Sequence, residues 1–134
     1  MVLQDNRNYC YTCIKIYTDI SWKWCKSCQI DNLKGNFTNW TSGNEKIDGF
    51  IQEMQLKINS QWDKVFEWIP YNQFDNIVII GEGGFATVCS AIWKNGPLCY
   101  NNYYMEYFRK PDKKVALKCL HNSQNITNEF LNKV

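Results

Sequence analysis

The sequence has no long apolar run, no strong excess of either charge, and little proline or histidine. None of its apolar runs approaches the ~18 residues that a membrane-spanning helix needs, so we expect no membrane partner. Its 15 basic and 13 acidic residues leave a net charge of +2, which gives no bulk attraction for nucleic acid. The first residues lack the apolar core of a secretory signal, which favours a cytoplasmic location. A chain of 134 residues predicts one domain, or a small domain with a smaller module.

Histidine is scarce, but cysteine is not: the chain has 7 cysteines and 1 histidine. In a reducing compartment, paired cysteines are more often metal ligands than disulfides. Two pairs follow the spacing C-x2-C-x11-C-x2-C, namely Cys10, Cys13, Cys25 and Cys28. Four thiolates around zinc make a closed tetrahedral site without an open position for water, so the predicted zinc site is structural. The alternative interpretation is that these are buried or idle thiols.

Residues 1–40 are expected to form a small zinc-ribbon-like segment. Between the two cysteine pairs, apolar residues occupy even positions on both sides of Thr18 and Asp19. Such alternation predicts a short β-hairpin. The alternating residues are Ile14, Ile16, Ile20, Trp22 and Trp24. A segment of about 40 residues cannot bury enough apolar surface to fold alone, so a bound metal ion would supply the missing stability.

Residues 41–73 are predicted to form an amphipathic helical connector. Ser42 and Glu45 have the spacing of a capping box, which predicts a helix start. Apolar residues then recur at steps of three and four for several turns, and Pro70 is expected to end the helix. The apolar stripe is expected to be core against a neighbouring sheet. The alternative is that the helix 43–69 docks a protein partner.

Residues 74–134 are rich in predicted strands around a glycine-rich loop. A strand at 74–80 leads through Gly-Glu-Gly-Gly-Phe-Ala into a second strand at 88–93, and a third strand is predicted at 115–120. A dinucleotide-binding turn would lead into a helix, and a P-loop would need Gly-Lys-Ser or Gly-Lys-Thr. The pattern therefore indicates a glycine-rich hairpin whose backbone amides approach phosphate oxygens, with Lys118 on an adjacent strand as a point charge.

At these residues the sequence resembles a protein kinase. The Gly-x-Gly-x-Phe-x-x-Val loop and the Val-Ala-Leu-Lys strand are similar to the glycine-rich loop and the lysine strand of that family. With its cysteine-rich start, the chain resembles an expanded tyrosine-kinase-like family of mycorrhizal fungi. The resemblance implies that Val88 and Ala116 sandwich the adenine of ATP and that Lys118 reaches the phosphates. The residues implied to cover the phosphates are Gly81, Glu82, Gly83, Gly84, Phe85 and Ala86.

The sequence departs from the kinase pattern at several places. The loop has Ala86 where the family has a third glycine, which is a mild change. The stretch 95–114 is longer than usual and is expected to be a mobile insertion, with a recognition surface for a protein as the alternative. A helix is expected near 125–134. There the family's glutamate partner of the strand lysine aligns with Lys133, and Glu129 would replace that partner only if the helix shifted.

The resulting expectation is an α+β fold in which residues 74–134 form a truncated protein-kinase small lobe. The function implied by the resemblance is phosphoryl transfer from ATP to protein hydroxyls. The sequence contains no His-Arg-Asp catalytic loop and no Asp-Phe-Gly metal-binding motif, so we expect no activity from this chain alone. The alternative is a non-catalytic, zinc-stabilised protein-interaction module or a pseudokinase fragment.

Overall fold

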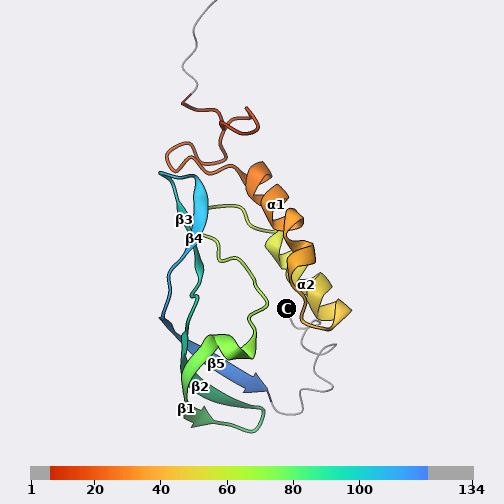
Figure 1. Cartoon of the computed structure of the whole chain (residues 1–134), viewed down its shortest axis with the longest axis vertical. Helices are drawn as coiled ribbons and strands as arrows, with labels where there is room; N and C mark the ends of the chain where they lie inside the picture. The colour runs from red at the N-terminus through yellow and green to blue at the C-terminus, as the bar shows by residue number, and fades with distance from the viewer. Residues whose placement is uncertain (1–6, 121–134) are drawn as a thin grey trace, which may run out of the picture.

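The computed structural model describes residues 7–120. These residues form an α+β structure with a three-stranded antiparallel sheet, a separate two-stranded hairpin and two α-helices, which confirms the predicted fold class at that level. The elements in chain order are α1 (Lys26–Gly35), η1 (Phe37–Asn39), α2 (Glu45–Gln55), η2 (Tyr71–Gln73), β1 (Phe74–Glu82), β2 (Ala86–Trp93), β3 (Leu98–Asn101), β4 (Glu106–Arg109) and β5 (Lys113–Leu120). Figure 1 shows the two α-helices on one side of the molecule, the β3–β4 hairpin across from them, and the three-stranded sheet at one end.

β2 is the central strand of the three-stranded sheet, in the order β1-β2-β5. β1 and β2 are antiparallel and are joined by the glycine-rich turn, so the predicted strand–turn–strand arrangement is confirmed. β5 pairs with β2 without interruption from Ala86 opposite Leu120 to Trp93 opposite Lys113. The third strand thus begins slightly before its predicted start. The register of the three strands determines which of the predicted site residues lie side by side.

The stretch 95–114 was expected to be a mobile insertion, but the structure forms the β3–β4 hairpin within it. Tyr100 is buried and belongs to a core cluster with Trp24 and Ile58. Tyr100 pairs directly with Tyr107, and their rings meet edge to face with centroids 5.3 Å apart. This aromatic face must be removed from water, and the cysteine-rich segment covers it.

The β-hairpin predicted between the cysteine pairs is wrong. The described part of this segment contains two isolated antiparallel bridges, and α1 begins directly after Cys25. Ile14 and Lys23 have positive φ angles of 62° and 51°, which an extended strand cannot contain. Ile14 is 76% exposed, whereas Trp24 is fully buried, so the alternating residues do not share one buried face. The chain bends after the first cysteine pair and again before the second.

The predicted helical connector is correct only for Glu45–Gln55, because residues 56–70 form turns and extended chain. The N-cap is Asn44 and not Ser42: the Asn44 side chain accepts hydrogen bonds from two backbone N–H groups of the first turn, at 2.9 and 3.2 Å. Pro70 does not end α2 but precedes the short η2 helix. α2 lies beside α1, and its Phe50 meets Phe66 of the returning chain edge to face.

Between residues 7 and 120, neither α-helix is long and apolar enough to cross a membrane. The helix expected near 125–134, with Glu129 and Lys133, lies outside the described residues. The predicted division into segments 1–40, 41–73 and 74–134 stays a prediction, although the β3–β4 hairpin packs against the first of them.

Candidate functional site

The four cysteines of the predicted metal site come together. Cys10 and Cys13 lie in a tight turn, Cys25 is the N-cap of α1, and Cys28 lies in its first turn. All four are free thiols, and their sulfur atoms lie within 4.8 Å of one another. The Sγ–Sγ distances are 3.7 Å for Cys10–Cys28 and 3.5 Å for Cys13–Cys25. Zinc–sulfur bonds of ~2.3 Å in a tetrahedron place neighbouring sulfurs about 3.8 Å apart, so this cluster can hold a metal ion such as zinc.

Backbone hydrogen bonds fix the turn that carries the first cysteine pair. The Cys10 N–H donates to the Lys15 carbonyl at 2.8 Å, and the Ile14 N–H donates to the Cys10 carbonyl at 2.9 Å. The second pair is fixed by the start of α1, where the Lys26 N–H donates to Thr18 Oγ1 at 2.9 Å. The positive end of the α1 dipole therefore faces the sulfur cluster, which favours thiolates.

The thiols of the cluster differ in pKa. Burial alone would raise the pKa of Cys10, but the N–H groups of Cys13 and Thr12 and the Cys28 thiol lower it to about 7. Burial raises the pKa of Cys25. Burial also raises the pKa of Cys28, and hydrogen bonds from its thiol to its neighbours raise it further. In the metal-free cluster, Cys10 therefore ionises at a lower pH than Cys25 and Cys28, and metal binding displaces the protons that remain.

A small core lies directly behind the cluster. Cys10, Tyr17 and Cys25 are buried together, and Met105 from the turn between β3 and β4 packs against them. The Tyr17 hydroxyl donates to the Met105 Sδ atom at 3.2 Å. Burial raises the pKa of Tyr17, so its hydroxyl stays protonated at neutral pH. With four protein ligands and a packed rear wall, the arrangement fits a structural metal site and leaves no open coordination position for catalysis.

The register of the sheet brings three of the predicted nucleotide residues, Val88, Ala116 and Lys118, to one face. Val88 lies directly opposite Lys118, and the next pair on the same face is Ser90 opposite Ala116. Cross-strand partners and alternate residues of a strand share a face, so Val88, Ala116 and Lys118 lie side by side. Gly81 pairs with Val88 from the other side, which places the start of the glycine-rich loop at the same point.

The glycine-rich loop is a tight turn with open space around it. The Gly83 N–H donates to the Ala86 carbonyl at 2.9 Å and closes the turn. Phe85 at its tip is 88% exposed. A Cβ atom added at Gly81 or Gly84 would meet nothing within 4 Å. Packing within the described chain therefore does not require glycine at these two positions.

Several side chains of the predicted nucleotide site are open to solvent. Ala116 and Lys118 are exposed on β5, and Glu82 is exposed at the end of β1. Ala86 is buried at the start of β2, so it lies below the tip of the loop and not at it. The sheet supplies one wall of a possible site, and its face is not covered by either helix of the described chain.

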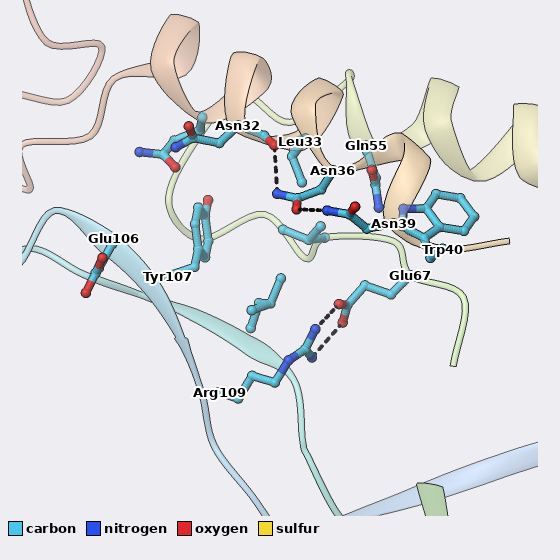
Figure 2. Close-up of a pocket in the computed structure, with 13 residues that line it drawn as sticks. Asn32, Leu33, Asn36, Asn39, Trp40, Gln55, Glu67, Glu106, Tyr107 and Arg109 are labelled. Atoms are coloured by element: carbon cyan, nitrogen blue, oxygen red, sulfur yellow. Dashed lines mark hydrogen bonds and ion pairs between the residues drawn. The ribbon is translucent and has the colours of Figure 1, made fainter. Parts of the chain in front are cut away.

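A separate cavity of about 520 Å³ lies between α1, the chain after α2 and the β3–β4 hairpin. None of the predicted nucleotide residues lines it. Figure 2 shows its polar lining, in which Arg109 forms a bidentate ion pair with Glu67. Gln55 is buried there and donates through Nε2 to the Phe66 carbonyl at 2.7 Å, while its Oε1 atom has no hydrogen-bond partner. No sequence pattern indicated this cavity, because its walls come from segments that are distant in the chain.

No protein-family model matches this chain, and no curated protein or solved structure matches it. Two arrangements are candidates for a functional site: the four-cysteine cluster, and the sheet face that combines Lys118 with the glycine-rich turn.

Proposed function

We propose that the three-stranded sheet is part of a protein-kinase-like small lobe that binds ATP. The observation that carries this proposal is the register of the sheet. Val88 pairs with Lys118 on one side and with Gly81 on the other, so the lysine and the start of the glycine-rich turn lie at the same level of the sheet. An ammonium group on this face can reach phosphates that lie under the turn, while Val88 and Ala116 offer a flat apolar surface to a purine. Nothing lies within 4 Å of a Cβ added at Gly81, so there is space beside the start of the turn for phosphate oxygens.

The reaction class of the proposed family is phosphoryl transfer from ATP to a protein hydroxyl. That reaction needs a base and magnesium ligands, which the family supplies from motifs that this sequence does not contain. We therefore expect weak nucleotide binding and no phosphate transfer by this chain alone. Transfer to a generic protein substrate that is abolished by Lys118→Met would contradict the second expectation.

Titration of the chain with MgATP, followed by tryptophan fluorescence and calorimetry, tests the nucleotide proposal. Lys118→Ala should raise the Kd about tenfold, because a lost charge-assisted contact costs ~1.5 kcal/mol. Lys113→Ala is the matched control, since Lys113 is exposed on the same strand but pairs with Trp93 on the opposite face. Equal effects of the two substitutions, or no binding by the unmodified chain, would contradict the proposal.

We also propose that zinc is the metal of the four-cysteine cluster and that its role is structural. The support is the sulfur geometry together with the absence of a disulfide among the described cysteines. A cytoplasmic location, which we propose on the same grounds, keeps such thiols reduced. Purified protein should contain about one zinc per chain, and chelation should expose four titratable thiols. Substoichiometric zinc with freely titratable thiols in the untreated protein would contradict this proposal.

A non-catalytic, zinc-stabilised interaction module is the second candidate function. It is favoured by the packing of the β3–β4 hairpin on the cysteine-rich segment, which builds a folded unit apart from the three-stranded sheet. The nucleotide titration separates the two candidates. Zinc binding without a Lys118-dependent response to MgATP would leave the module as the better description.

A further inference from the structure

The β3–β4 hairpin connects the cysteine cluster to the strand that carries Lys118. It is inserted between β2 and β5, so both of its ends lead into paired strands of the three-stranded sheet. Its turn reaches the cluster through Met105, which packs against the core of Cys10, Tyr17 and Cys25. The hairpin therefore contacts the core behind the cysteine cluster and is joined to the two strands that carry Val88 and Lys118; Figure 1 shows it between these two regions.

Hydrogen bonds hold the hairpin on the cysteine-rich segment. The Tyr100 hydroxyl donates to the Lys23 carbonyl at 2.5 Å, and Trp24 Nε1 donates to the Tyr107 hydroxyl at 3.0 Å. Trp24 is fully buried and Tyr100 is 8% exposed, so these bonds are shielded from water. Each bonded atom would be costly to leave without a partner in such surroundings. The hairpin therefore keeps this position only while the cysteine-rich segment stays folded.

At its other end, the hairpin is braced against the sheet. Gly96 has a φ of +72°, and its backbone lies so close to Lys110 that an added Cβ would be 1.6 Å from the Lys110 carbonyl oxygen. The Lys110 N–H donates to the Pro97 carbonyl at 3.1 Å, and the Asp112 N–H donates to the Lys94 carbonyl at 2.9 Å. The chains that enter and leave the hairpin thus contact each other directly, immediately before Trp93 pairs with Lys113.

The hairpin has little stability of its own. Its two strands have four residues each, and an isolated two-stranded hairpin is marginal in water. Without metal, the cysteine-rich segment also lacks enough apolar surface to stay folded. If that segment opens, the hairpin loses its cover, and β2 and β5 are then connected by a flexible loop of about 20 residues, which costs closure entropy.

We propose that the β3–β4 hairpin positions the Lys118 strand in response to metal occupancy of the four-cysteine cluster. Tyr100 and Tyr107 are the positioning residues, because their hydroxyl groups bond the segment that the metal holds. The loaded cluster fixes the hairpin, the hairpin fixes the paired start of β5, and β5 presents Lys118 to the nucleotide face. This inference rests on the proposed zinc centre and, for its effect on ligand binding, on the proposed nucleotide site.

Amide hydrogen exchange of the full chain, with zinc and after chelation, measures the connection without any need for activity. We expect metal removal to speed exchange in the β3–β4 hairpin and also in β5 from Lys113 to Lys118, by at least about tenfold. MgATP binding, measured in parallel, should weaken to a similar extent. Metal analysis of each sample reports whether zinc is present, so a failure of the metal centre is seen separately from a failure of the connection.

A double variant, Tyr100→Phe with Tyr107→Phe, tests the route through the hairpin. It should retain about one zinc per chain, since neither residue is a ligand, while exchange in β5 should no longer depend on the metal. If the two tyrosines were only structural, the double variant would exchange faster by the same factor with and without zinc, so the effect of the metal on β5 would persist. The matched control is Tyr103→Phe with Tyr104→Phe, whose side chains are 81% and 68% exposed in the turn between the same strands. Its metal response should equal that of the unmodified chain.

The inference is wrong if exchange in β5 is the same with and without zinc in the unmodified chain. It is also wrong if the double variant keeps the full metal response, or if the chain binds no metal. Absence of MgATP binding, with the exchange response intact, would overturn the proposed nucleotide function and leave the mechanical connection standing.

Discussion

At the scale of single residues, Asp48 fixes the start of α2. Its carboxylate accepts hydrogen bonds from the Ser42 N–H at 2.8 Å and from the hydroxyl groups of Ser42 and Thr41, each at 2.5 Å. The Ser42 hydroxyl first, then the Thr41 hydroxyl and the Ser42 N–H, lower the pKa of Asp48. The carboxylate also lies in the first turn, where it interacts favourably with the helix dipole.

We predict that Asp48→Asn lowers stability at pH 7 and weakens the dependence of stability on acid. A carboxyl whose folded pKa is depressed stabilises the fold above its unfolded pKa of about 3.9, and the contribution is lost as pH falls through the folded value. Urea denaturation between pH 7 and pH 2.5 measures both effects. Asp31→Asn, on the exposed side of α1, is the control. The prediction fails if Asp48→Asn keeps the acid dependence of the unmodified chain, or if Asp31→Asn weakens that dependence equally.

Among the glycines, Gly96 is the one at which an added methyl group should lower the stability of the fold most. Its positive φ and its approach to the Lys110 backbone both exclude a side chain. We predict that Gly96→Ala costs about 3 kcal/mol or more, since backbone must move on both sides. Gly49→Ala in α2 should instead stabilise by about 0.5–1 kcal/mol, because nothing lies within 4 Å and alanine favours helix. Denaturant titration of the two variants should therefore give opposite signs, and equal signs would contradict the geometry.

At the scale of elements, the bond between Trp24 and Tyr107 holds the β3–β4 hairpin on the cysteine-rich segment. Tyr107→Phe leaves the N–H of a fully buried Trp24 without a partner, so we predict a loss of about 1–3 kcal/mol in the free energy of unfolding. Adding Trp24→Phe to this variant should cost less than the same change in the unmodified chain. Urea denaturation of the zinc-loaded proteins measures this cycle, and additive costs would show that the bond contributes nothing.

Sequence patterns predicted the elements whose causes are local. The strands around the glycine-rich turn are β-branched runs on either side of glycines, and both were found. α1 was missed because its apolar residues do not gather on one face, so its sequence KSCQIDNLKG carries no amphipathic signal. Cys25 is the N-cap of this helix and Cys28 lies in its first turn, and the spacing of the cysteine pairs predicted the cluster correctly but not the helix that presents it. The cysteine spacing therefore predicted which side chains come together better than it predicted the secondary structure around them.

At the scale of the whole molecule, contacts between distant residues could not be predicted from the sequence. Tyr17 bonds Met105 and Trp24 bonds Tyr107, across more than 80 residues in each case. The alternation of apolar residues in a segment indicates which face is buried, but it does not indicate which distant segment packs against that face. The cavity beside Gln55 was missed for the same reason, since three separated segments line it. By contrast, the glycine-rich turn joins β1 directly to β2, so the pairing of these two strands follows from a local turn and could be predicted.

The three-stranded sheet exposes an unusual amount of apolar surface for its size. Along β1, Val78, Ile79 and Ile80 are 57%, 59% and 62% exposed, and Phe85 adds the tip of the turn. Register shifts on both sides of Val78–Ile79 bulge this edge strand, which hinders regular pairing with another strand. The exposed side chains themselves remain available for association. We therefore predict that the chain self-associates through these side chains and not through the strand edge.

We predict that Val78→Lys with Ile80→Lys weakens self-association at least tenfold, measured by sedimentation equilibrium, because the added charges must be desolvated for the surfaces to meet. Stability should change by less than about 1 kcal/mol, since both side chains are already mostly in water. Tyr103→Lys is the control, as Tyr103 is 81% exposed on the β3–β4 hairpin, away from the sheet. If Tyr103→Lys weakens association as strongly as the double variant does, net charge is responsible and the sheet is not the contact surface.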